Sequence, residues 1–90
     1  MDEDLRRMRQ EEVDRNYEAF LKILPQILPE HRGKYALMKN GAILGYYSTP
    51  QDAGATAEAF IKDRLYSIQH VTNAPADLGY FSHAVSLVSV

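Results

Sequence analysis

The pair Asn40-Gly41, set between two apolar runs, is the feature that most constrains the fold of this chain. Both residue types tolerate a positive φ, so Asn-Gly between apolar segments predicts a β-hairpin with a two-residue turn. Residues 34–39 and 42–48 are then expected to form two antiparallel strands.

A two-residue turn also sets the pairing of the two strands. Side chains on both faces of this hairpin are apolar, whereas a hairpin with one face in water alternates apolar with polar residues. We therefore expect each face to have a neighbour, which is a helix, the C-terminal tail or another subunit. The expected cross-strand pairs are Lys39–Ala42, Met38–Ile43, Leu37–Leu44, Ala36–Gly45 and Tyr35–Tyr46.

The N-terminal third predicts an amphipathic helix over residues 3–24, because good helix formers dominate and apolar residues recur on one helical face. Pro25 and Pro29 predict that this helix stops or kinks near residue 24, since each lacks a backbone donor and disfavours helix in the residue before it. The apolar face consists of Val13, Tyr17, Phe20 and Leu24.

A second helix is expected to begin after Thr49, which can act as its N-cap, and to end near Asp63. Pro50 suits the first helical position, and the acidic Asp52 suits the first turn. Residues 66–72 then predict a third strand, parallel to its neighbour if it pairs with the second strand and antiparallel if it pairs with the first. The expected apolar face of this helix is Ala53, Ala57, Phe60 and Ile61.

These elements together predict an α+β fold, with an N-terminal helix followed by a small three-stranded sheet in β-β-α-β order. We expect one domain over residues 1–72. Residues 73–90 form an apolar C-terminal tail that packs on the domain or on a partner.

Residues 33–72 carry a Gly-Lys-aromatic-Ala strand, an Asn-Gly hairpin and a Thr-Pro-x-Asp-Ala helix start. In these features the segment resembles a type of small bacterial ββαβ domain that has no assigned activity. The resemblance implies the fold of this segment and supplies no catalytic residue.

The composition excludes several classes of protein. Cysteine is absent, which removes disulfides and thiolate chemistry, and the net charge of −2 argues against sequence-independent binding of nucleic acid. No apolar run approaches the roughly 18 residues of a membrane span, and the charged start is unlike a secretory signal. We therefore expect a cytoplasmic protein that does not contact a membrane.

Two sets of residues raise the question of catalysis. His70, Asp77 and His83 are residue types that bind zinc or iron, so a metal-dependent enzyme is one alternative, although their spacing fits no compact motif. Asp77, Ser82 and His83 are the residue types of a nucleophilic triad, but adjacent side chains point apart in an extended segment. The prediction is that the protein is not an enzyme and has no metal or cofactor.

A second alternative is a nucleic-acid-binding, antitoxin-like regulator. This alternative places four basic side chains in one small spot near one end of the hairpin, beside its tyrosines, an arrangement typical of platforms for single-stranded nucleic acid. The small number of basic residues and the acidic net charge weigh against it. The basic residues concerned are His31, Arg32, Lys34 and Lys39.

The C-terminal third points to association with another chain. Asp77 is the only formal charge in residues 65–90, and aromatic and apolar residues gather around Gly79. Two apolar sheet faces, exposed strand edges and this apolar segment favour a non-catalytic protein-interaction or regulatory module. We expect a homodimer, or a complex with one protein partner, with contacts from Tyr46, Leu78, Tyr80 and Phe81.

Overall fold

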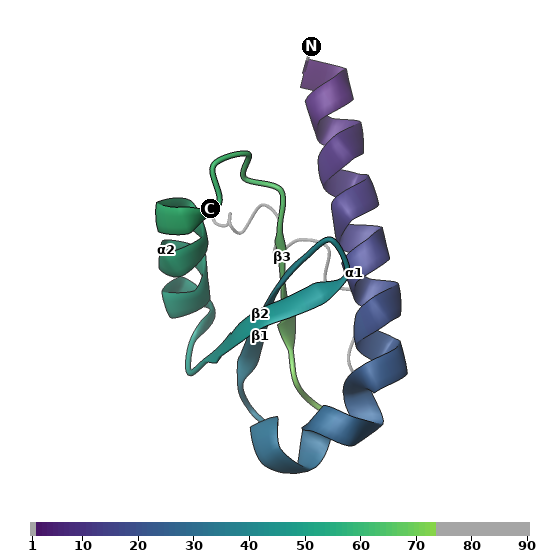
Figure 1. Cartoon of the computed structure of the whole chain (residues 1–90), viewed down its shortest axis with the longest axis vertical. Helices are drawn as coiled ribbons and strands as arrows, with labels where there is room; N and C mark the ends of the chain where they lie inside the picture. The colour runs from purple at the N-terminus through teal and green to yellow at the C-terminus, as the bar shows by residue number, and fades with distance from the viewer. Residues whose placement is uncertain (1, 74–90) are drawn as a thin grey trace.

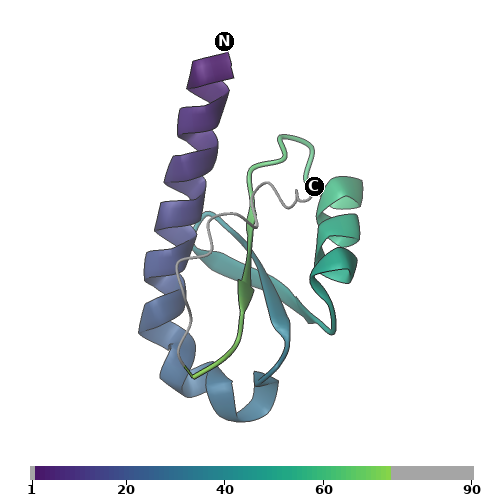
Figure 2. The ribbon, with the colours of Figure 1, turned by 180° about the vertical axis from the view of Figure 1, so that it is seen from behind.

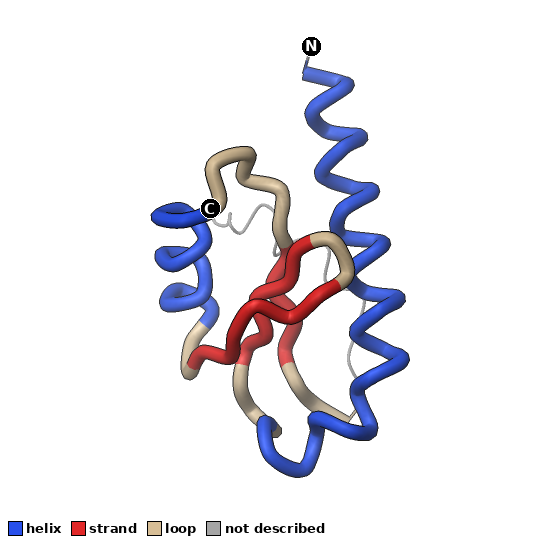
Figure 3. The backbone as a smooth tube through the Cα atoms, in the orientation of Figure 1, coloured by secondary structure: helices blue, strands red, loops and turns tan. Residues whose placement is uncertain are grey.

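The chain forms two helices and three strands in the computed structural model, which describes residues 2–73 (Figures 1 and 3). The strands lie in the order β2-β1-β3, and β1 pairs antiparallel with both neighbours. The α+β class is confirmed, and the third strand takes the antiparallel orientation expected for pairing with the first strand. Along the chain the elements are α1 (Asp2–His31), β1 (Tyr35–Lys39), β2 (Ala42–Tyr47), α2 (Pro50–Phe60) and β3 (Ser67–His70).

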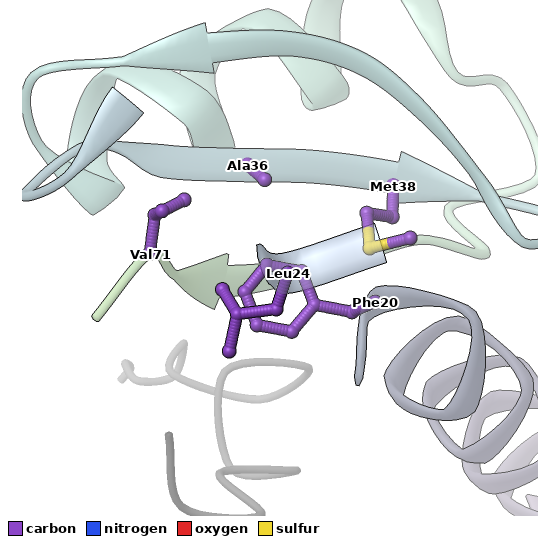
Figure 4. Close-up of a cluster of buried hydrophobic side chains, with 5 residues drawn as sticks. All are labelled: Phe20, Leu24, Ala36, Met38 and Val71. Carbon is purple, nitrogen blue, oxygen red and sulfur yellow. The ribbon is translucent and has the colours of Figure 1, made fainter. Parts of the chain in front are cut away.

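A helix covers each face of the sheet (Figures 1 and 2). The expectation that both faces of the hairpin have neighbours is therefore confirmed, with α1 on one face and α2 on the other. Figure 4 shows the core under α1, which consists of Phe20, Leu24, Ala36, Met38 and Val71. The core under α2 consists of Leu37, Ala53, Ala57, Ile61 and Ile68.

Helix α1 is longer than the sequence predicts, because it continues through Pro25 and Pro29 to His31. Both prolines lie on the exposed side of the helix, so neither ring disturbs the packing of α1 on the sheet. Ile27 and Leu28 pack against the core and hold the last turns in place. The axis bends in this region (Figure 1), as expected where proline interrupts the helical hydrogen bonds.

The two-residue turn is confirmed, since Asn40 and Gly41 adopt φ values of 54° and 80°. The two pairs nearest the turn, Lys39–Ala42 and Met38–Ile43, are also as expected. Beyond them the expected register is wrong by one residue, because a β-bulge interrupts the ladder between Leu37 and Met38. The observed pairs there are Leu37–Gly45, Ala36–Tyr46 and Tyr35–Tyr47.

Leu44 is the extra residue of this bulge, and it has no partner on β1. The shift reverses the faces of the residues that follow, so that Tyr46 packs on the α1 side and Tyr47 on the α2 side. Gly45 permits this arrangement, since a Cβ atom there would lie 3.0 Å from the hydroxyl oxygen of Tyr47.

Helix α2 begins as predicted and ends earlier than predicted. Thr49 is its N-cap, and the Thr49 hydroxyl accepts a hydrogen bond of 3.0 Å from the backbone N–H of Asp52. The helix ends at Phe60, and Ile61 turns into the core in an extended conformation. Phe60 was expected on the buried face, but it is 79% exposed. Neither α1 nor α2 has an apolar stretch long enough to cross a membrane.

Candidate interaction surfaces

A buried polar cluster ties α1 to the hairpin turn. Glu12 and Asn16 lie one turn apart on α1, and both side chains are buried. The Glu12 carboxylate accepts a hydrogen bond of 2.7 Å from the backbone N–H of Asn40, and the Asn16 side-chain oxygen accepts one of 2.6 Å from Gly41. The turn thus offers its backbone donors to α1 rather than to water.

The Asn16 side-chain nitrogen extends the same cluster to the sheet. It donates to the Ser67 hydroxyl at 2.9 Å, to the Met38 carbonyl at 3.2 Å and to Glu12 at 3.1 Å. Arg15 donates to the other Glu12 oxygen at 2.9 Å. Because these groups are paired with one another, the cluster fixes the position of α1 on the sheet. Sequence analysis missed this role, although two polar residues four apart within an apolar helical stripe are a signal for it.

Two stacked pairs lie at the end of the sheet opposite the turn. The His31 ring stacks on Tyr46 with 3.7 Å between ring centroids and 3° between planes. The Tyr35 ring stacks on His70 with 4.6 Å between centroids and 11° between planes. Burial, followed by the negative charge of Glu30, raises the pKa of Tyr46. Tyr46 is thus a part-buried packing residue at this end of β2.

The four basic residues that were expected to share one spot do not lie together. Arg32 and Lys34 precede β1, whereas Lys39 ends it, and a five-residue strand separates its ends by about 13 Å. Lys39 donates to Asp63 at 2.8 Å and to the Leu65 carbonyl at 2.9 Å. Arg32 donates to the side chain of Asn73. This prediction of a single basic spot is wrong, because Lys39 lies at the turn of the hairpin, at the other end of β1 from the basic residues that precede it.

The residues proposed for a metal site are divided by the limit of the described chain. His70 ends β3 and stacks on Tyr35, whereas Asp77, Ser82 and His83 lie outside residues 2–73. Leu78, Tyr80 and Phe81 lie outside it as well, so Tyr46 is the described member of the expected partner contacts. Within residues 2–73 no group of three or more His, Asp or Glu side chains is placed to hold a metal ion.

Strand β2 forms one outer edge of the sheet, and its far side pairs with no other described strand. Its six residues include no charged residue and no proline, and the Leu44 side chain at the bulge is 54% exposed. The other outer strand, β3, is shorter, with four residues. Other exposed large apolar side chains of the described chain are Leu5, Met8, Leu21 and Phe60.

Comparison of the chain with protein-family models, with curated proteins and with solved structures gave no match. The resemblance of residues 33–72 to a small bacterial ββαβ domain therefore stays a prediction. Arguments about function rest on the surfaces described above.

Proposed function

We propose that this protein is a non-catalytic interaction module that self-associates by pairing β2 with β2 of a second copy. The observation that carries the proposal is the composition of this strand, which is an uncharged, proline-free sheet edge. Edge strands present unpaired N–H and C=O groups, and monomeric proteins protect them with charges, prolines, bulges or very short strands, of which β2 has only the bulge at Leu44.

Geometry favours a second copy as the occupant of this edge. A strand that pairs antiparallel with its own copy forms a two-fold interface, in which each chain supplies the same residues. The bulge leaves Leu44 exposed beside the edge, where contact with the second copy would remove it from water. Pairing would extend the three-stranded sheet to six strands.

Sedimentation equilibrium of the full chain over a range of concentrations tests the proposal. The wild-type protein should dimerise, and Leu44→Lys should weaken the dimer at least about tenfold, because a charged side chain opposes pairing at an edge. Leu21→Lys is the matched control, because Leu21 lies on α1 and is 43% exposed.

A wild-type chain that is monomeric at every concentration would overturn self-association and leave a different protein as the partner. Equal weakening by both lysine variants, or weakening by Leu21→Lys alone, would overturn the assignment of the interface to β2.

A further inference from the structure

Side chains on the two sheet faces decide whether a strand can pair with its own copy. In an antiparallel pair, residues directly opposite each other lie on the same face of the sheet. Side chains alternate between the faces along a regular strand, so the first and last residues of six lie on opposite faces. A regular strand with the length of β2 therefore cannot pair with a second copy over its full length, and has to slip by one residue.

The two ends of β2 nevertheless lie on the same face. Ala42 lies opposite Lys39, and Lys39 is two residues from Leu37, which belongs to the core under α2. Tyr47, at the other end of the strand, packs against the same core. Both ends of β2 are thus on the α2 side of the sheet.

The residues between the two ends are matched in the same way. Ile43 and Tyr46 both pack against the core under α1. Leu44 and Gly45 lie between them, at the bulge. The extra residue of the bulge moves every later side chain to the other face, so the order of faces along β2 is the same from either end.

The free backbone groups of β2 have the same symmetry. Successive residues of β1 direct their N–H and C=O groups alternately to β2 and to β3. Because the pair that flanks a two-residue turn is hydrogen-bonded, the next residue of β1, Met38, turns to β3, and so does Ala36. Ile43 and Tyr46, which lie opposite these two residues, therefore direct their own N–H and C=O groups to the free edge.

We propose that β2 pairs with a second copy over its full length, with Ile43 opposite Tyr46 of that copy, and that the bulge makes this register possible. The register depends on the proposed self-association through β2. Each Leu44 then lies opposite Gly45 of the second copy, where the ring of Tyr47 occupies the place of the missing side chain. Leu44, which is 54% exposed in one chain, is thereby covered by an aromatic ring.

Amide hydrogen exchange of the wild-type chain at low and high concentration tests this register. The N–H groups of Ile43 and Tyr46 should both exchange about tenfold more slowly at a protomer concentration about a hundred times Kd, because fewer than about one chain in ten is then monomeric. Slipped registers that also match the faces pair Ile43 with Ile43 or Tyr46 with Tyr46, and they overlap only half of β2. Slower exchange of only one of these two amides would overturn the register and leave self-association through β2 standing.

Disulfide cross-linking tests the register independently, because the chain has no cysteine of its own. An equal mixture of Ala42→Cys and Tyr47→Cys should form a cross-linked dimer on oxidation, since Cα atoms of opposite residues lie about 4.5–5.5 Å apart, within the range of a disulfide. Neither variant alone should cross-link, because its two thiols would lie about 16 Å apart along the strands. Cross-linking of Ala42→Cys to Leu44→Cys in place of Tyr47→Cys would show the slipped register and overturn the proposal.

Sedimentation of the same samples separates failure of the register from failure of the proposed function. Chains that stay monomeric at every concentration would overturn the self-association and the register together. A dimer in which neither amide slows and the mixed variants do not cross-link would overturn the assignment of the interface to β2.

Discussion

Replacing Asn16 with alanine should destabilise the fold more than any other polar substitution in the described chain. The Asn16 side chain is completely buried and joins three elements, because it contacts Glu12 on α1, Ser67 on β3 and the backbone at the turn. Alanine preserves the helix and removes all of these hydrogen bonds together.

The magnitude follows from the groups that lose a partner. Leaving a buried polar group unsatisfied costs about 1–3 kcal/mol. The Gly41 N–H is half-buried and has Asn16 as its acceptor, the Glu12 carboxylate loses one donor and keeps Asn40 and Arg15, and the Ser67 hydroxyl can rotate to another partner. We therefore expect a loss of about 3 kcal/mol from the free energy of unfolding. For a domain of this size the total is about 5–13 kcal/mol, and the corresponding drop in Tm is about 12–24 °C.

Guanidinium chloride denaturation followed by circular dichroism measures this loss. Gln10→Ala is the control, because Gln10 is exposed on α1 and its change should stay within about 0.5 kcal/mol. A loss below about 1 kcal/mol for Asn16→Ala would refute the conclusion that this cluster holds α1 on the sheet.

Two further predictions concern the turn and the loop before β3. Gly41→Val should lower the free energy of unfolding by about 2 kcal/mol in a denaturant titration, whereas Gly41→Asn should lower it much less. An added Cβ at Gly41 meets no atom closer than 3.8 Å, so the loss comes from the φ of 80° and not from a clash. Equal losses for the two variants would contradict this reasoning. Burial, and then the hydrogen bond from its hydroxyl to Glu58, raises the pKa of Tyr66 to about 12. The pKa of Tyr66 in the folded state is above the unfolded value of about 10. The protonated hydroxyl therefore contributes fully to the stability of the fold below pH 10, and this contribution is lost between about pH 10 and 12. Tyr66→Phe should therefore lose less stability than the wild type between pH 9 and pH 11.5, and equal losses would show that the Tyr66 hydroxyl does not contribute.

Local sequence determined the parts of this fold that depend on a few consecutive residues. Asn40 and Gly41 are residue types that readily adopt a positive φ. The Thr49 hydroxyl accepts a hydrogen bond from the N–H of Asp52, three positions away. The amphipathic pattern of α1 and the apolar runs on either side of Asn40-Gly41 predicted which elements form. These preferences depend on residues only a few positions apart, so they can be predicted from the sequence without knowing how the elements pack together.

Tertiary packing decided the register beyond the bulge, the length of α1 and the position of the basic residues. The bulge at Leu44 depends on which face of the sheet Tyr46 and Tyr47 occupy. Packing against both helices determines those faces. The prolines of α1 are tolerated because they lie on the face of the helix that is exposed to water, whereas the neighbouring face packs on the sheet.

The polar residues gain their roles in the same way. Asn16 meets Gly41 across 25 positions of sequence and Ser67 across 51. Sequence alone shows a buried polar side chain as a break in an apolar stripe, and it does not show which distant donor or acceptor will face it. The hydrogen-bond partner of such a side chain is determined by the packing of α1 on the sheet. Only that packing brings the backbone groups of the turn and the side chains of β3 within hydrogen-bond distance of α1.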